Sequence, residues 1–216
     1  PAFATPLGPL AGDRTLADIP RRDRMAELGF ELPLAGGEVT RSDLRLADLV
    51  PLLREHLSFP DPLAAYPDAL ADPALADQTL RGFLTGSIDA VLRVPGPDGE
   101  PRYLVVDYKT NWLGPLDGPP LTVGQYTPSR MAGAMVRAHY PLQALLYAVA
   151  VHRLLRWRQP GYDPSRHLGG VLYLFVRGMA GPTTPVVDGV PCGVFSWRPP
   201  GKLVAALSDR LDGDAT

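Results

Sequence analysis

The chain has little cysteine and no long hydrophobic run. Cys192 is the only cysteine among 216 residues, which excludes an internal disulfide, a thiolate zinc site and a four-cysteine iron–sulfur cluster. Cys192 lies beside a predicted strand, and we expect it to be buried or in a turn, because a reactive thiol needs an electropositive environment. No run of about 18 apolar residues and no basic-then-apolar leader is present, so we expect a cytoplasmic protein without a membrane span.

Lysine is also scarce. Of 21 basic residues, 19 are arginine and only Lys109 and Lys202 are lysine. An arginine guanidinium does not lose its proton in a protein, whereas a lysine ammonium can. A lysine at position 109 therefore favours chemistry there over a simple positive charge.

Charge is unevenly distributed along the chain. The net charge of −2 argues against generic nucleic-acid binding, but residues 1–100 carry 9 basic and 16 acidic side chains and residues 101–216 carry 12 and 7. Seven arginines and one acid, Asp163, lie between Arg130 and Arg177. This pattern is compatible with a basic face for a polyanion and, equally, with a solvated helix face.

Hydrophobic periodicity predicts an α/β fold with a mixed sheet and no internal repeats. Residues 1–27 lack periodicity apart from a helical turn in 21–29, and we interpret them as a linker from a preceding region. The chain begins at Pro1 without a methionine, which suggests a fragment, and 28–216 form one domain. Strands are expected at Phe30–Leu34, Gly82–Val94, Tyr103–Trp112, Gly169–Arg177 and Val194–Trp197, and helices at Ser42–His56, Pro128–Ala138, Tyr140–Trp157 and Lys202–Leu211.

Three of these segments carry further expectations. Ser42 or Asp43 is a candidate N-cap, and Pro51 leaves one helix or two short ones open. Residues 113–129 are dense in Gly and Pro and predict an exposed loop that covers a substrate. Gln143 and Tyr147 share one face of the helix that Pro141 starts. The alternative interpretation of Gln143 is a satisfied polar group at a packing boundary.

The strand Tyr103–Trp112 ends in an acid and a base. Side chains alternate along a strand, so Val105, Asp107 and Lys109 share one face. Asp89, on the neighbouring predicted strand, is expected beside them. Two carboxylates with a lysine suit Mg²⁺ and phosphodiester hydrolysis, with the carbonyl of Tyr108 as a further ligand. The spacing alone leaves a structural ion pair and a catalytic site equally open.

Four ordered blocks then match a known family. The blocks are residues 86–94, 103–114, 140–147 with 152–156, and 167–178. They closely resemble the C-terminal nuclease domain of RecB, the beta subunit of exodeoxyribonuclease V, and the likeness extends over about residues 28–212. The resemblance implies a PD-(D/E)XK, restriction-endonuclease-like core with a mixed sheet flanked by helices.

The resemblance also implies roles for individual residues. Asp89 and Asp107 become metal ligands for Mg²⁺, with Mn²⁺ or Ca²⁺ as alternative occupants, and Lys109 becomes the catalytic lysine. Gln143 and Tyr147 match the family's Gln-x-x-x-Tyr motif on the DNA side of the site. Glu31 falls where the family has a glutamate in its first strand, although its setting alone favours a solvent-facing side chain. Candidate DNA contacts are Arg130, Arg137, Arg153 and Arg156.

The family's activity sets the functional expectation. It implies a metal-dependent deoxyribonuclease in double-strand break repair and recombination, fed with single-stranded DNA by a helicase region of the same polypeptide, beside sister subunits of a RecBCD-like heterotrimer. A catalytically silent, nuclease-like scaffold is the alternative, and the single cysteine excludes a related iron–sulfur nuclease. The family's metal-binding histidine lies before its first strand, where this chain has no counterpart, since His56, His139, His152 and His167 all fall elsewhere.

Overall fold

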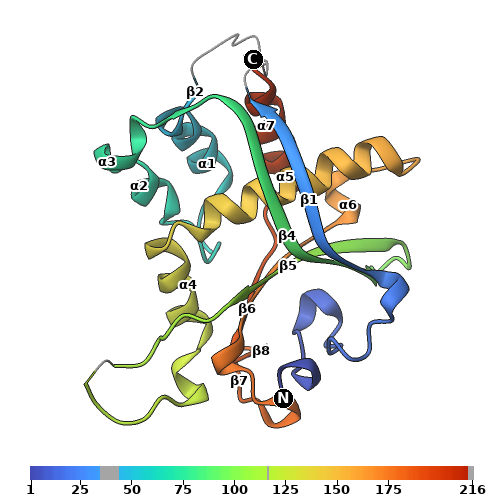
Figure 1. The fold of residues 1–216 in the computed structure, drawn as a ribbon, viewed down its shortest axis with the longest axis vertical. Helices are drawn as coiled ribbons and strands as arrows, with labels where there is room; N and C mark the ends of the chain where they lie inside the picture. Colours follow the sequence, from blue (N-terminus) through green and yellow to red (C-terminus); the bar gives the residue numbers. More distant parts are fainter. Residues whose placement is uncertain (35–43, 116, 214–216) are drawn as a thin grey trace. The chain divides into compact units, whose positions relative to one another are not determined.

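The computed structural model describes residues 1–34, 44–115 and 117–213, and it has the predicted α/β fold with a mixed sheet (Figure 1). The main sheet has the strand order β1-β4-β5-β6-β9. Its strands are β1 (Arg24–Leu34), β4 (Gly82–Pro95), β5 (Pro101–Lys109), β6 (Leu168–Phe175) and β9 (Val194–Trp197). Two short antiparallel ladders were not predicted, namely β2 (Leu44–Arg45) with β3 (Thr79–Leu80) and β7 (Val186–Val187) with β8 (Val190–Pro191).

The helices follow the predicted periodicity closely in the second half of the chain. They are α1 (Val50–His56), α2 (Tyr66–Leu70), α3 (Pro73–Ala76), α4 (Pro128–Arg137), α5 (Tyr140–Arg158), α6 (Pro164–His167) and α7 (Gly201–Asp212). Pro141 lies in the first turn of α5, as expected for a residue without an N–H. None of the helices in the described part of the chain has the length and apolar character needed to cross a membrane.

The predicted helix at Ser42–His56 is split into two short pieces. A 3-10 helix spans Leu46–Leu49 and α1 follows from Val50, with Pro51 in its first turn. Pro51 fits there because its missing N–H needs no partner at a helix start. The candidate N-caps Ser42 and Asp43 lie outside the described residues.

The chain divides into two compact units, and β1 and β4 run from one into the other. Unit 1 contains Pro1–Leu28, Ile88–Met135 and Gly169–Arg198, and unit 2 contains Gly29–Ser87, Val136–Leu168 and Pro199–Thr216.

The expectation that the first residues are a linker is wrong. Leu7, Ala11, Leu16 and Ile19 are buried in the same hydrophobic cluster as side chains of β4, β5 and β6 in unit 1. The periodicity is missing because Ala2–Ala4 and Pro9–Ala11 form only single 3-10 turns. The helical turn expected in 21–29 is limited to Arg21–Asp23, after which β1 begins.

Unit 2 is built mainly of helices. Helix α5 is its longest element and contacts α7, which in turn contacts α1 and α6. Ten of the 19 residues of α5 are buried, which is far more than one stripe. A helix buried on most of its circumference is a core helix.

Candidate functional site

The two acids come together at the end of the β4–β5 ladder in unit 1. The strands are antiparallel, with Ala90 opposite Val106, and one further step of this register places Asp89 opposite Asp107. The backbone N–H of Tyr108 donates a hydrogen bond to Asp89 Oδ2 at 2.9 Å. Leu104 to Asp107 are buried consecutively, because β5 is the third of five strands and both of its faces are covered.

Asp107 and Lys109 lie on the same face, as predicted. Lys109 Nζ is 2.7 Å from Asp107 Oδ2, and the side chains are only 13% and 6% exposed. The approach lacks hydrogen-bond geometry, and no other group in the described part of the chain donates a hydrogen bond to this buried oxygen. Asp107 Oδ2 thus keeps lone pairs for a ligand, although it is neutralised by a nearby ammonium.

The surroundings of Asp107 work against its ionisation. Burial raises the pKa of the Asp107 carboxyl, the Lys109 ammonium opposes this shift, and the negative charge of Asp89 adds to it. Burial and the charge of Asp89 also raise the pKa of the Tyr108 hydroxyl. A cation placed between the two carboxylates would relieve their repulsion.

The donor set fits a hard, partly hydrated cation. The described residues include no group of three or more His, Cys, Asp or Glu side chains that could hold a metal, so the protein offers two carboxylates and backbone oxygens. Mg²⁺ commonly binds through one or two carboxylates and keeps several waters. Asp107 Oδ2 and the exposed Asp89 are suited to such an ion, and the Tyr108 carbonyl remains a predicted ligand.

Three side chains around Lys109 were not identified from the sequence. The Tyr173 ring of β6 lies with its centroid 5.1 Å from Lys109 Nζ. Tyr126 OH donates to the carbonyl of Asn111, and Arg177 Nε donates to the carbonyl of Thr110, each at 2.9 Å. These residues fix the chain just after Lys109. Only the aromatic content of β6 hinted at a partner for the lysine.

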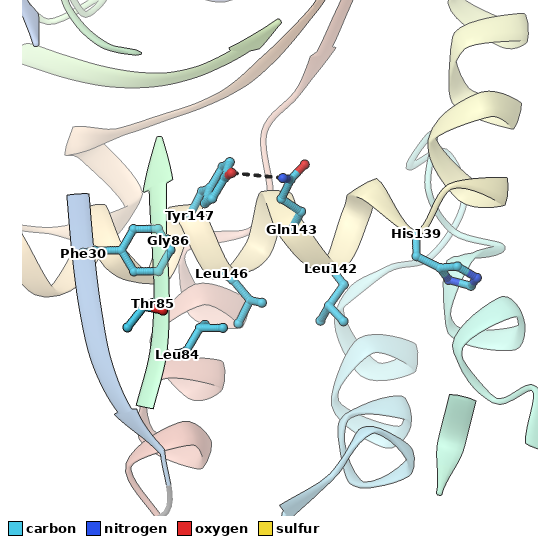
Figure 2. A pocket seen from close by; sticks show the side chains of 9 residues that line it. All are labelled: Phe30, Leu84, Thr85, Gly86, His139, Leu142, Gln143, Leu146 and Tyr147. Carbon is cyan, nitrogen blue, oxygen red and sulfur yellow. Dashed lines mark hydrogen bonds between the residues drawn. The ribbon is translucent and has the colours of Figure 1, made fainter. Parts of the chain in front are cut away.

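Gln143 and Tyr147, the predicted motif pair, lie in unit 2. Gln143 Nε2 donates to Tyr147 OH at 3.0 Å on α5, as drawn in Figure 2. Both residues line a cavity of about 320 Å³, together with Phe30 and Gly86. The Phe30 ring meets the Tyr147 ring edge-on, with the centroids 5.8 Å apart.

Glu31 also lies in unit 2, on β1 beside Phe30, and its side chain is exposed. This fits the solvent-facing interpretation, and its role as a ligand stays a prediction.

The predicted DNA-contacting arginines differ in their exposure and in their contacts within the chain. Arg130, Arg137 and Arg156 are exposed. Arg153, by contrast, donates to Ser208 Oγ at 3.0 Å and to the Ser208 carbonyl at 2.8 Å, and it forms an ion pair with Asp212 at 2.7 Å. Its guanidinium therefore joins α5 to α7.

Two of the histidines and the cysteine are structural. His152 Nδ1 lies 2.9 Å from Tyr162 OH, and His167 Nδ1 lies 2.9 Å from the carbonyl of Asp163. Cys192 is buried, as predicted, and burial raises the pKa of its thiol. A buried thiol with a raised pKa is a poor nucleophile.

Comparison with known proteins places the chain. No protein-family model matches it. It is 58% identical over all 216 of its residues to the RecBCD enzyme subunit RecB of Mycolicibacterium smegmatis, and 58% identical over 214 residues to that of Mycobacterium tuberculosis. It is 34% identical over 199 residues, 92% of the chain, to the RecB subunit of Escherichia coli.

These matches cover only part of the relatives. The chain spans 19% of the length of each mycobacterial subunit and 14% of the E. coli subunit. All of the predicted blocks fall within the M. smegmatis match, which runs the full length of the chain. The chain thus belongs to the RecB family, as the counterpart of one segment of that subunit.

Proposed function

We propose that this chain is a Mg²⁺-dependent nuclease domain of the PD-(D/E)XK type that hydrolyses phosphodiester bonds in single-stranded DNA. The observation that carries the proposal is the buried Asp107 Oδ2, which faces the Lys109 ammonium at 2.7 Å and has no other polar partner among the described residues. A buried carboxylate oxygen with a single ammonium beside it keeps a lone pair for a ligand.

The proposed roles follow from burial and charge. Asp89 and Asp107 hold the ion, which supplies charge stabilisation at the phosphate and activation of water. Lys109 is the counter-charge of the buried Asp107 carboxyl, and it orients the attacking water or helps to deprotonate it. Tyr173 confines the lysine side chain, so that Nζ stays beside Asp107.

The wider setting comes from the relatives. They are named as RecB subunits of RecBCD enzymes, which supports a role in recombinational repair of double-strand breaks within a heterotrimer of that kind. We propose that single strands reach the site from a helicase region of the same polypeptide. The alternative of a silent scaffold has no feature in its favour, because the acid-acid-lysine set is intact.

The test uses Asp107→Ala with Mg²⁺ and a labelled single-stranded oligonucleotide. Cleavage should disappear, as it should for the wild-type chain in EDTA, while the circular dichroism spectrum stays unchanged. Cys192→Ala serves as a buried control that keeps cleavage. An Asp107→Ala protein that still degrades DNA with magnesium would falsify the proposal.

A further inference from the structure

The last turn of α5 presents three consecutive exposed residues, Arg156, Trp157 and Arg158. Trp157 is 73% exposed, which is unusual for the largest apolar side chain. The guanidinium carbon of Arg158 lies 3.7 Å from the centroid of the Trp157 indole ring. At this distance the cation is held against the ring by the ring quadrupole.

The sequence around Trp157 has a net positive charge. Arg156 and Arg158 form no salt bridge with any residue in the described part of the chain, in contrast to Arg153 one turn earlier. Residues 156–166 carry three arginines and one acid, Asp163. The Asp163 carboxylate accepts a hydrogen bond from the backbone N–H of Ser165 at 2.7 Å, as the N-cap of α6.

Helix electrostatics explain only part of this arrangement. Basic residues in a last turn interact favourably with the helix dipole, which accounts for Arg156 and Arg158. The indole gains nothing from the dipole, and its ring stays in water. Phe59, which is 93% exposed, shows that an exposed aromatic need not carry cations, since its charged neighbours in sequence are Glu55 and Asp61.

An exposed indole between two arginines has the chemistry that single-stranded nucleic acid requires. Bases stack on aromatic rings without regard to sequence, and arginines supply cation–π contacts and phosphate partners. The composition of this turn therefore favours a polyanion with exposed bases.

We propose that Trp157, with Arg156 and Arg158, is a stacking platform for one base of single-stranded DNA, separate from the acid pair. The identity of the nucleic acid as DNA rests on the proposed function. The platform itself needs no metal, because its contacts are stacking and charge. It would hold a strand on unit 2 in the absence of any cleavage.

The test measures binding of fluorescent oligo(dT) by anisotropy in EDTA, where cleavage cannot occur. Trp157→Ala should weaken binding about tenfold, as expected for the loss of one stacked base, and Trp157→Phe should restore most of the affinity. Phe59→Ala is the matched control and should bind like the wild type. With an oligonucleotide made of abasic residues, the wild type and Trp157→Ala should bind equally.

The salt dependence of binding tests Arg156 and Arg158 separately from Trp157. In Arg156→Gln and Arg158→Gln, the slope of log affinity against log salt concentration should fall by about 0.7 for each lost phosphate contact. Wild-type affinity of Trp157→Ala for oligo(dT) would overturn the platform. That result is also the one expected if Trp157 contacts a protein partner instead of DNA. Failure of the proposed function is a separate result, namely magnesium-dependent cleavage that survives Asp107→Ala.

Discussion

The hydroxyl of buried Tyr126 donates a hydrogen bond to the carbonyl of Asn111 at 2.9 Å, two residues beyond Lys109. The carbonyl of Thr110 is held in the same way by Arg177. The chain that leaves β5 is therefore fixed by side chains from two other segments of unit 1. This fixes the exit of the strand that carries both Asp107 and Lys109.

Replacing Tyr126 with Phe should destabilise the protein by about 1 kcal/mol, because one partly buried hydrogen bond is lost and the Asn111 carbonyl loses this donor. Unfolding in urea measures the change. Tyr103→Phe is the control, since its hydroxyl makes no hydrogen bond within the described residues. Equal stability of the two variants would show that the Tyr126 bond contributes nothing.

Replacing Lys109 with Arg should lower the cleavage rate by roughly 10²- to 10⁴-fold, the range for losing a positioned proton-transfer group. Arginine keeps the charge, but it is bulkier and does not release a proton. Lys109 has little room, because its side chain is only 13% exposed and both Asp107 and the Tyr173 ring lie close to Nζ. Cleavage assays at saturating Mg²⁺ measure the effect.

The only other lysine provides the control. Lys202 is exposed on α7, and Lys202→Arg should cleave like the wild type. If Lys109→Arg were fully active, the ammonium would act only as a counter-charge for Asp107.

The raised pKa of Asp107 predicts a pH dependence of stability. The carboxyl binds its proton more tightly in the folded chain than in the unfolded chain, whose value is near 3.8. Its stabilising contribution is therefore present at low pH and is lost as pH rises from 3.8 through the folded pKa. Asp107→Asn lacks this titration.

The difference in unfolding free energy between the wild type and Asp107→Asn should thus fall as pH rises through that window. Urea unfolding of both proteins at a series of pH values, without divalent metal, measures it. A difference that grows with pH would mean that Lys109 lowers the Asp107 pKa more than burial raises it.

The shared face of Asp107 and Lys109 was predictable, because the alternation of side chains along a strand is a local property. Asp107 and Lys109 are two residues apart, so any strand there puts both on one face. Their burial could not be read from the sequence, since it depends on β5 being third in the sheet order. For the same reason Tyr173 was missed, because no periodicity says which strands are neighbours.

Segments without periodicity were the least predictable. Residues 1–20 appear as a linker by composition, yet Leu7 and Ile19 are core residues. Their positions in the core are set by single 3-10 turns and long-range packing, which leave no repeating signal. Arg153 and Arg156 similarly appear alike in the sequence, and only the Ser208 and Asp212 contacts distinguish them.

That difference predicts opposite effects for the two arginines. Arg153→Met should destabilise the protein by about 3 kcal/mol, because its largely buried guanidinium joins α5 to α7 and the Asp212 carboxylate loses its partner. Arg156→Gln should change stability by less than about 0.5 kcal/mol, as for most exposed positions. Thermal unfolding compares them, and a stable Arg153→Met protein would refute the structural role.

Two glycines in unit 2 test the packing of the cavity that Gln143 and Tyr147 line. A Cβ at Gly86 would lie 2.6 Å from Phe30 Cζ, whereas a Cβ at Gly29 would meet nothing within 4 Å. Gly29→Ala should stabilise the chain by up to about 1 kcal/mol, because alanine restricts the unfolded state. Gly86→Ala should instead destabilise it by about 1 kcal/mol, since the Phe30 ring must move from its edge-on contact with Tyr147.

A double-mutant cycle separates this steric effect from a general intolerance of side chains at position 86. In a Phe30→Leu background the ring is absent, so Gly86→Ala should lower the free energy of unfolding much less. The coupling free energy between the two changes should therefore exceed about 0.5 kcal/mol, the deviation from additivity expected for independent sites. Urea unfolding of the four proteins gives the coupling. Additive effects would mean that the Phe30 ring does not contact Gly86 in solution. Phe30 would then not line the cavity beside Gln143 and Tyr147 as it does in the structure.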